Sequence, residues 1–598
     1  MIQVVSAKKR KPVRKKVAPK KKRCVNKVTQ PRGNGVGGLK TRGYFIASIL
    51  LGAFVWLSIN LVLVGVMPVQ EPTKKPTMLA FHEPLRGNIY DTHGQLLATT
   101  IKVRSLYADP KSVMNVNEIV TKLRNVLPYL NKEKLHKTLN RKARFAWIAR
   151  KLTPTQAKNV NNLGLPGLAF REEKVRMYPQ GNVMSHMIGG INGSGSGVSG
   201  IEKSYDDRLA SGEDITLTLD LRLQAQLRES LQSKLDESGA KGASGIVLDP
   251  QTGAVTAMVS LPDYDLNHYG SSSPESWQNR ATYSLYELGS TFKIFTLAEG
   301  LEEGKITPLS KLDCRKPLEI DKFKIHDFHA KKKMLSAQEV FRYSSNIGAA
   351  RIADMFKPEE QREFFHKLNL LQPMDIAINE KGRSLYPNRL GRIYTLTMAY
   401  GHGIAVTPMH MAAAAGSLVS DGFYKTPYFV KGEATKEGEQ VVSTNTVKAM
   451  RNLMRDVVQN GTARNAKVAG YDIGGKTGTA EKNIKGKYVR NKNISSFIGV
   501  LPLDSPKMLV SIVLDEGQIN GKSGGGTLAA PVFASFVRKA APLIGLLPTE
   551  QSHIAGKKVK KVKKEVKKLV KPVYNKPQTQ SPSGAELDEI FRLVASAN

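Results

Sequence analysis

Apolar and polar positions divide the chain into segments of very different character. The stretch "YFIASILLGAFVWLSINLVLVGV", residues 44–66, contains 23 residues and no charge. Because about 20 such residues suffice for a helix to cross a bilayer, this stretch predicts a transmembrane anchor. Strongly basic residues precede it, which predicts a cytoplasmic N-terminus and an exported remainder. A cleaved signal peptide is the alternative, but its shorter apolar region and Ala-x-Ala-like cleavage site are not seen.

Residues 80–235 combine short strand-like runs with glycine-bearing turns, which predicts a β-rich region. At its end, leucine recurs at every fourth position and predicts an amphipathic helix that stops near Gly239. The leucines are Leu219, Leu223, Leu227, Leu231 and Leu235.

Beyond residue 240 the pattern changes. The segment "ASGIVLDPQTGAVTAMVS" has two β-rich runs around a turn, and "SSFIGVLPLDSPKMLVSIVLDE" near the end repeats this hairpin pattern. Alanine-rich, helical stretches fill 290–460, and "AAPVFASFVRKAA" predicts a further helix. Strands at both ends with helices between them predict one α+β domain whose sheet joins the two ends. The predicted order is a basic tail (1–43), an anchor (44–66), a pedestal domain (67–239), a second domain (240–546) and a Lys-rich tail (547–598).

The net charge of +39 resides largely in two tails. Residues 1–43 carry 15 Lys or Arg and no acid, and residues 557–571 carry nine Lys and one Glu. The anchor topology accounts for the first tail, so charge alone does not favour a nucleic acid partner. The second tail has apolar residues at helical spacing, which fits either an anionic membrane surface or a solvated segment. The two cysteines, Cys24 and Cys314, fall on opposite sides of the predicted span and cannot pair, so the exported part is held by its core.

The segment "YSLYELGSTFKIF", 283–295, contains the first candidate chemistry, Ser290 and Lys293. A serine hydroxyl becomes nucleophilic when a neighbouring base takes its proton, and residues i and i+3 share one face of a helix. The helix N-terminus would favour a developing oxyanion. Lys293 can be the base only if its usual pKa of about 10.4 falls by roughly 3 units. Burial and a nearby cation both act in that direction.

Two more motifs follow Ser290 in a fixed order. Ser344-Ser345-Asn346 begins 54 residues after Ser290, and Lys476-Thr477-Gly478-Thr479 begins 132 residues after Ser344. The first lies in a predicted loop and the second on a predicted edge strand. Each motif is weak alone, since Ser6-Ala7-Lys8-Lys9 repeats the Ser-x-x-Lys pattern in the basic tail. The ordered combination is typical of penicillin-binding proteins and class A β-lactamases.

The chain resembles class B penicillin-binding proteins over residues 44–546. Besides the three motifs, the resemblance rests on "RGNIYDTHGQLLA" (86–98), "YPQGNVMSHMIGGIN" (178–192), "GVSGIEKSYDDRL" (197–209) and "YGHGIAVTPMHMA" (400–412). The set is most similar to the division-specific subgroup, penicillin-binding protein 3, with the elongation-specific subgroup as the alternative.

The resemblance implies an α+β fold in which a membrane-anchored, β-rich pedestal precedes a transpeptidase domain with an antiparallel sheet flanked by helices. It implies septal peptidoglycan cross-linking by D,D-transpeptidation of D-Ala-D-Ala stem peptides, inhibited by β-lactams, without cofactor or metal. Expected partners are a SEDS-family lipid II polymerase and other division proteins. The expected location is the inner membrane at the division septum, with the catalytic domain in the periplasm.

The resemblance also implies the role of each motif residue. Ser290 is the nucleophile, Lys293 its base, and Ser344 the proton relay to the leaving D-Ala. Asn346 holds the donor peptide, and the terminal carboxylate is bound by Lys476, Thr477, Gly478 and Thr479. Backbone N–H groups of Ser290 and Thr479 are the expected oxyanion hole.

Some residues depart from the family pattern. Leu288 replaces a proline, His402 stands where many relatives have tyrosine, and the pedestal is shortened between Leu209 and Leu217. A neutral His402 is the favoured interpretation. A β-lactamase that deacylates with water and a non-catalytic division scaffold remain the alternative functions, although no deacylating glutamate is assigned and every motif residue is present.

Overall fold

The computed structural model describes residues 48, 50–59 and 84–548, except for 321, 389–390, 434–437 and 485. The chain forms two units, Met1–Glu83 and Pro84–Asn598. In the first, residues 50–59 are helical and exposed. None of the helices in the described ranges is both long and apolar enough to span a bilayer. Much of the predicted anchor, the basic tail with Cys24, and the Lys-rich tail beyond 548 lie outside the described residues.

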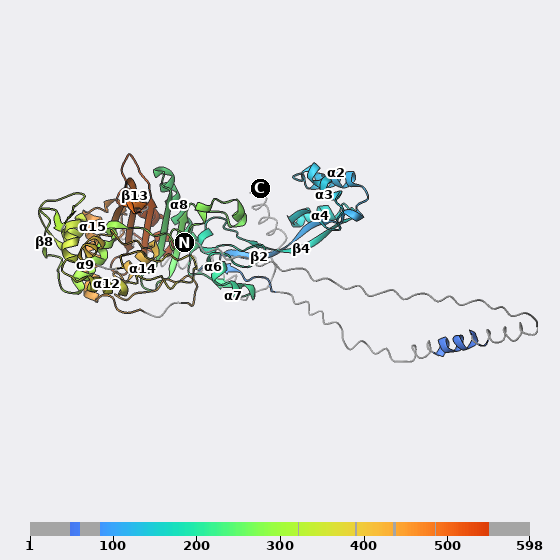
Figure 1. The fold of residues 1–598 in the computed structure, drawn as a ribbon, viewed down its shortest axis with the longest axis horizontal. Coiled ribbons are helices and arrows are strands. Elements are labelled where there is room, and N and C mark those ends of the chain that lie inside the picture. The colour runs from blue at the N-terminus through green and yellow to red at the C-terminus, as the bar shows by residue number, and fades with distance from the viewer. Residues whose placement is uncertain are drawn as a thin grey trace, which may run out of the picture. The chain divides into compact units, whose positions relative to one another are not determined.

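A five-stranded sheet forms the centre of the C-terminal domain (Figure 1). Its strands are β6 (Gly242–Leu248), β7 (Val255–Leu261), β12 (Gly474–Ile484), β13 (Lys487–Leu501) and β14 (Met508–Asp515). Their order is β12-β13-β14-β6-β7 and all neighbours are antiparallel. Both predicted hairpins are present. Since β14 pairs with β6, with Ser511 opposite Ile246, the sheet joins the two ends of the domain as predicted.

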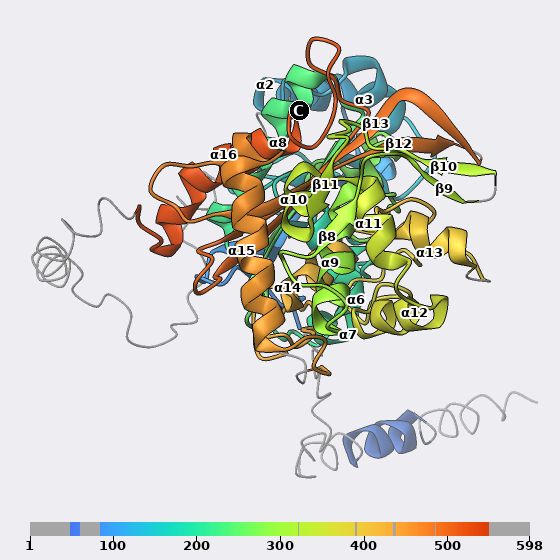
Figure 2. The ribbon, with the colours of Figure 1, turned by 90° about the vertical axis from the view of Figure 1, so that its left-hand side faces the viewer.

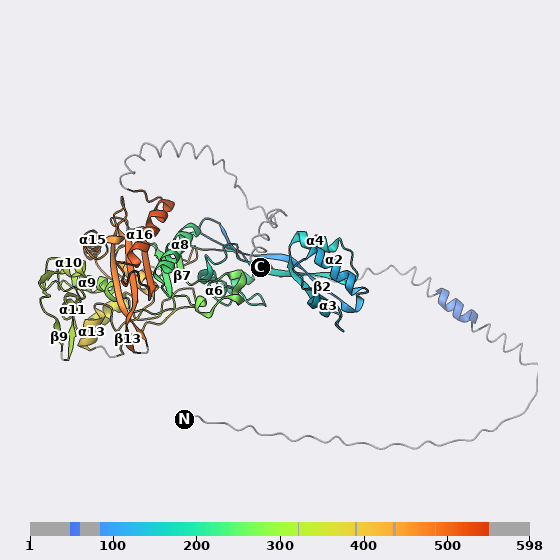
Figure 3. The ribbon, with the colours of Figure 1, turned by 90° about the horizontal axis from the view of Figure 1, so that it is seen from above.

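Helices cover both faces of this sheet (Figure 3). On one face lie α8 (Leu221–Ser238), which Gly239 terminates in a left-handed conformation, and α16 (Ala529–Ala540). Packing is so close that a Cβ on Gly245 would lie 2.8 Å from Leu231 Cδ1 of α8. Leu248 points to the opposite face, against α14 (Pro408–Ser417). The antiparallel sheet flanked by helices is therefore confirmed.

A helical lobe beside the sheet positions the first two motifs (Figure 2). Its elements are η4 (Gly289–Phe292), α9 (Lys293–Glu302), α10 (Ala337–Tyr343), α11 (Asn346–Ala353), α12 (Pro358–Lys367), α13 (Arg392–Met398) and α15 (Thr444–Asn460). Short strands separate α9 from α10: β8 (Lys311–Asp313), β9 (Leu318–Ile320), β10 (Phe323–Ile325) and β11 (Met334–Ser336).

The pedestal is mixed α/β and not β-rich as predicted. Its strands are β1 (Ile89–Tyr90), β2 (Leu96–Ala108), β3 (Ala146–Leu152), β4 (Leu168–Met177) and β5 (Ile215–Thr216). Its longer helices are α2 (Val116–Val126), α3 (Lys132–Leu139) and α4 (Pro154–Asn161). Each begins at a capping side chain, from Asn115, Asn131 and Thr153 respectively. The three helices gather at one end of β2 and β4 and bury a core of their own, separate from that of the sheet domain.

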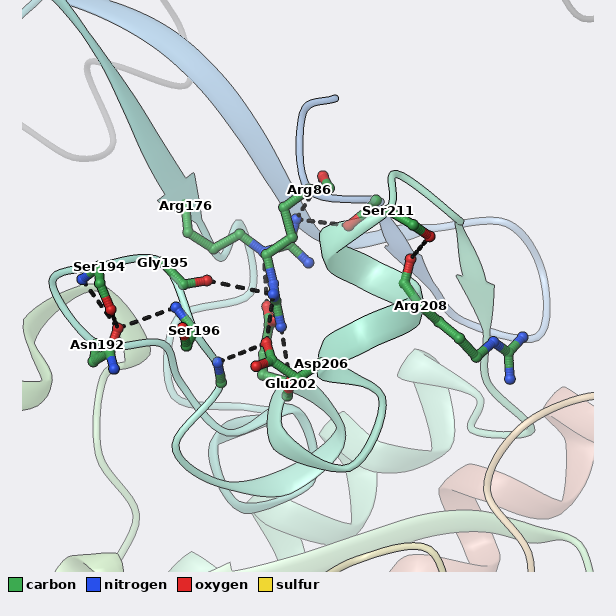
Figure 4. A network of polar contacts seen from close by, with 12 residues as sticks. Arg86, Arg176, Asn192, Ser194, Gly195, Ser196, Glu202, Asp206, Arg208 and Ser211 are labelled. Carbon is green, nitrogen blue, oxygen red and sulfur yellow. Dashed lines mark hydrogen bonds and ion pairs between the residues drawn. The ribbon is translucent and has the colours of Figure 1, made fainter. Parts of the chain in front are cut away.

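A buried ion network joins the pedestal segments 86–98 and 197–209 through Arg176 (Figure 4). Arg86 Nε and Arg176 Nε donate to the two carboxylate oxygens of Glu202, at 2.6 and 2.7 Å. Arg86 Nη1 donates to Asp206 Oδ1 at 2.7 Å. Glu202 is fully buried and pairs with both arginines. Arg86, Arg176 and Glu202 are therefore buried structural residues of the pedestal.

Candidate active site

The structure brings the three motifs together around the side chain of Lys293. Its Nζ lies 2.7 Å from Ser290 Oγ and 2.7 Å from Asn346 Oδ1. Ser290 is the second residue of the helical segment η4–α9, while Asn346 begins α11, so two helix starts meet at this amine. Ser290 is partly exposed, whereas Lys293 is completely buried. A reactant can therefore reach the hydroxyl while the amine stays shielded from water.

The Ser344 hydroxyl lies between the two motif lysines. Its Oγ is 3.3 Å from Lys293 Nζ and 2.9 Å from Lys476 Nζ. Ser344 ends α10 in the left-handed region, with φ 62°, which is uncommon for a residue other than glycine. Such conformations persist where surrounding contacts fix them, and they concentrate at functional sites. The strained turn places one hydroxyl in reach of both amines.

Burial controls the protonation of both lysines. It lowers the pKa of Lys293 well below the usual value, and the charge of Lys476 lowers it further, while Asp327 acts in the opposite direction. Burial also lowers the pKa of Lys476 to about 7. Burial and the charge of Lys476 thus favour the neutral form of Lys293, the form that a general base needs. A bound carboxylate would favour the charged form of Lys476.

Glycines allow the backbone around Ser290 to pack at very short range. Gly289 has φ +56°, and a Cβ there would lie 2.5 Å from Thr479 O. A Cβ on Gly478 would lie 2.3 Å from Leu288 O, and one on Gly401 would lie 2.2 Å from Gly289 O. The turn that carries Ser290 is therefore held between β12 and the 401 loop by backbone contacts. This brings the backbone of Ser290 close to that of Thr479, the expected partner in the oxyanion hole.

The third motif lies on β12, which is an edge strand as predicted. Lys476 and Thr477 are buried, and Thr477 Oγ1 is 2.8 Å from Thr462 Oγ1. Thr479 is exposed, and its hydroxyl accepts from Gly525 N at 3.2 Å. Hydroxyl groups and the Lys476 amine therefore line one edge of the site, where an extended peptide with a terminal carboxylate would fit.

Asp327 is a site residue that the sequence did not reveal. Its carboxylate accepts from Ser345 Oγ at 2.7 Å and from Ile347 N at 2.9 Å, at the N-terminus of α11. The neighbouring carbonyl of His326 accepts from Asn346 Nδ2 at 3.0 Å. The loop before β11 thus fixes the second motif. No local pattern marks Asp327, because its partners lie about 20 residues further along the chain.

We expect Asp327→Asn to slow acylation of Ser290 by a β-lactam about tenfold, because it weakens two charge-assisted hydrogen bonds worth about 1.5–3 kcal/mol each. The second-order rate constant with a fluorescent penicillin measures this effect. Asp313→Asn is the matched control, since Asp313 is a nearby carboxylate whose side chain pairs with Arg315. Equal rates for both variants would show that Asp327 does not position the second motif.

A cluster beside the serine surrounds Glu287. Tyr488 OH donates to Glu287 at 3.0 Å, and His402 Nδ1 lies 3.6 Å from the same carboxylate. Burial lowers the pKa of His402 to about 4, with a further contribution from Lys293, so this histidine is neutral at neutral pH. Glu287, Gly403 and Glu481 contribute to the lining of an adjacent cavity of about 530 Å³.

In the described ranges, no group of three or more His, Cys, Asp or Glu is arranged to hold a metal ion.

A serine at a helix start, a buried lysine and a second lysine on the edge of an antiparallel sheet define a serine acyl-transfer protein of the penicillin-interacting class. Residues 243–538 match the family model of the penicillin binding protein transpeptidase domain. Residues 81–240 match the model of the penicillin-binding protein dimerisation domain.

Curated relatives cover most of the chain. The probable peptidoglycan D,D-transpeptidase FtsI of Caulobacter vibrioides is 36% identical over 488 residues, 78% of this chain and 82% of that protein. The peptidoglycan D,D-transpeptidase FtsI of Escherichia coli K12 is 29% identical over 526 residues, 82% of this chain and 88% of that protein. The fold is similar to that of penicillin binding protein 3 from Mycobacterium tuberculosis, solved with aztreonam, with a TM-score of 0.62 at 24% identity. That match covers 78% of this chain and 98% of the solved chain.

The chain belongs to the penicillin-binding protein transpeptidase family. The resemblance to class B, division-type members that the motifs indicated is confirmed, and with it the two-domain order of a pedestal followed by a transpeptidase domain. The domain limits and the roles of the individual motif residues remain predictions.

Proposed function

We propose that this protein is a septal peptidoglycan D,D-transpeptidase that works through an acyl-enzyme on Ser290. The observation that carries the mechanism is the 2.7 Å separation of Ser290 Oγ from the buried Lys293 Nζ. The relatives named as D,D-transpeptidases support the reaction type, and two FtsI proteins among them support the division role over the elongation role.

The first half-reaction forms the acyl-enzyme. Neutral Lys293 takes the Ser290 proton as Oγ attacks the carbonyl carbon of the penultimate D-Ala. The oxyanion accepts hydrogen bonds from the backbone N–H groups of Ser290 and Thr479. When the peptide bond breaks, the leaving D-Ala nitrogen receives its proton through the Ser344 hydroxyl, which lies within reach of both lysines. Asn346 holds the donor peptide, while Lys476, Thr477 and Thr479 bind its terminal carboxylate.

The second half-reaction transfers the acyl group. An amine from a neighbouring stem peptide attacks the ester carbon and loses a proton to Lys293. Ser290 Oγ departs and regains its proton, which leaves a new peptide cross-link. A β-lactam would enter the same path and stop at the ester, because no amine displaces it rapidly. A β-lactamase, the alternative function, would instead hydrolyse penicillin with repeated turnover.

The cellular setting is also a proposal. Residues 44–66 anchor the chain in the inner membrane, with the catalytic domain in the periplasm at the division septum. A SEDS-family lipid II polymerase and other division proteins are its partners there. The 23-residue uncharged stretch and the basic residues before it support the anchor and its orientation.

A penicillin adduct tests the proposed function. In the full-length protein, mass spectrometry should place a long-lived penicilloyl group on the peptide that contains Ser290. Ser290→Ala should not label, whereas the exposed Ser271→Ala should label as the wild type does. Labelling of Ser290→Ala would refute the nucleophile assignment, and rapid turnover of penicillin would favour a β-lactamase. If expression of this protein does not restore septation in a strain depleted of it, the division role is contradicted.

A further inference from the structure

A second cavity lies next to the segment that leads to Ser290. Its volume is about 500 Å³, within the range of roughly 300–1,000 Å³ of small-ligand sites. Leu285 and Tyr286 line both this cavity and the one beside Glu287, so the two are neighbours. Leu285 precedes Ser290 by five residues, a distance of at most about 18 Å along an extended chain. The charged residues that line this second cavity are Lys241, Arg280, Lys381, Arg383, Lys482 and Asp515.

Two of these five cations are already balanced by carboxylates. Lys482 Nζ lies 2.7 Å from Asp515 Oδ1 and 2.9 Å from Glu516 Oε1. Lys241 Nζ lies 2.9 Å from the other oxygen of Glu516. These ion pairs lie at the ends of β12, β14 and β6 and fix one wall of the cavity. The charge that they leave uncompensated comes from the remaining three cations.

Arg280 is the most informative of the remaining three. It is only 8% exposed, its Nε has no hydrogen-bond partner, and Nη1 reaches Gln278 Oε1 only at 3.3 Å. A Cβ on Gly242 would lie 2.0 Å from Nε, so the side chain lies directly over the start of β6. In the part of the chain that the structure describes, no carboxylate forms an ion pair with Arg280 or with exposed Arg383. A buried guanidinium without a counter-charge is costly unless a ligand provides one.

We propose that this cavity is a carboxylate-binding subsite for the peptide substrates. Guanidinium groups match the planar geometry of a carboxylate and bind it with charge-assisted hydrogen bonds. Arg280 supplies the buried, pre-positioned donor, while Lys381 and Arg383 at the rim attract the anion. The inference rests on the proposed function, because it needs a peptide bound at Ser290. The carboxylate comes either from the donor peptide that acylates Ser290 or from the acceptor peptide that later receives the acyl group.

Matched peptides distinguish these two sources in the full-length protein. The donor arm uses two peptides that end in Lys-D-Ala-D-Ala and carry either glutamate or glutamine before the lysine. Competition with a fluorescent penicillin gives the rate constant of acylation for each. The acceptor arm loads Ser290 with the glutamine donor and compares Gly-Glu with Gly-Gln as acceptors, with cross-linked product as the readout.

We expect the wild type to prefer the glutamate peptide in one of the two arms. Arg383→Gln and Arg280→Gln should each lower that preference, by about tenfold for the buried arginine, because each removes charge-assisted hydrogen bonds to the carboxylate. Reactions of the glutamine peptides should be unchanged. Arg362→Gln, which removes an exposed cation on α12, is the matched control. High salt should weaken the part of the preference due to Arg383.

Loss of preference in the donor arm assigns the subsite to the donor, and loss in the acceptor arm assigns it to the acceptor. The proposal is overturned if neither arm shows a preference, or if the variants leave an existing preference intact. Should Arg280→Gln fail to fold, the exposed Arg383→Gln decides the matter. Labelling of the wild type by the fluorescent penicillin reports on the proposed function separately, so a failed subsite and a failed function give different results.

Discussion

The Lys293→Arg variant is expected to lose acylation of Ser290 almost completely. A guanidinium keeps its proton at any working pH, so it cannot accept the serine proton. General-base catalysis contributes about 10²–10⁴-fold, and a loss in this range is the expected effect on the rate constant with fluorescent penicillin. Lys305→Arg makes the same change at an exposed lysine outside the three motifs, and this control variant should acylate normally. Retained acylation in Lys293→Arg would remove Lys293 from the mechanism.

The pH dependence of acylation supplies a second measure of the same assignment. The wild-type rate should rise with pH as Lys293 loses its proton. Because burial and Lys476 lower the pKa of Lys293, the rise should level off well below pH 10.5. An unperturbed lysine would instead let the rate increase up to that pH. A rate that keeps rising up to about pH 10.5 would contradict a base with a lowered pKa.

The Gly289→Ala variant is expected to acylate about 10²–10³-fold more slowly while keeping its fold, the range reported for removal of one oxyanion-hole donor. The new Cβ would lie 2.5 Å from Thr479 O, so the turn that carries Ser290 must move away from β12. This movement would separate the two backbone N–H groups expected to bind the oxyanion. The acylation rate tests the predicted slowing, and a thermal melt of the same preparation tests whether the fold is kept.

The Gly304→Ala variant is a control that distinguishes the effect of the close contact at Gly289 from the effect of backbone strain. Gly304 has φ +63°, close to the +56° of Gly289, but nothing lies within 4 Å of a Cβ placed there. An alanine in this left-handed region costs about 1–2 kcal/mol at either position. Both variants should therefore melt earlier than the wild type, and only Gly289→Ala should acylate slowly. Normal acylation by Gly289→Ala would mean that the turn does not depend on this contact.

The regular elements of the sheet domain were predictable because their signals are local. The hairpin at 249–253, the helix that stops at Gly239 and the edge position of the third motif all follow from short patterns of apolar residues and turns. The pedestal helices had a signal as well, since Val116, Val120 and Leu123 of α2 follow helical spacing after the capping Asn115. Glycine-bearing strand-like runs on either side obscured it, and the region was interpreted as β-rich.

The parts of the site that escaped prediction depend on long-range contacts. Asp327 reaches the second motif only because the loop before β11 folds back onto α11, and nothing in its neighbours indicates this. The left-handed turn at Ser344 contradicts the local preference of serine and exists because two lysine amines and α10 surround it. The residues of the three motifs were predictable by type and order, and the i, i+3 spacing predicted that Ser290 and Lys293 lie together. The short distances from Ser344 to both lysines were not predictable from local patterns.

The glycine contacts around Ser290 restrict how this protein can escape an inhibitor by mutation. Positions 289, 401 and 478 cannot accept a side chain without moving the backbone that the natural reaction also needs. Variants that discriminate between a drug and the natural peptide must therefore arise at the surrounding side chains, such as Glu287, His402 and Tyr488. Resistance substitutions in this chain are therefore expected among the side chains around the cleft and not at the glycines that hold the Ser290 turn.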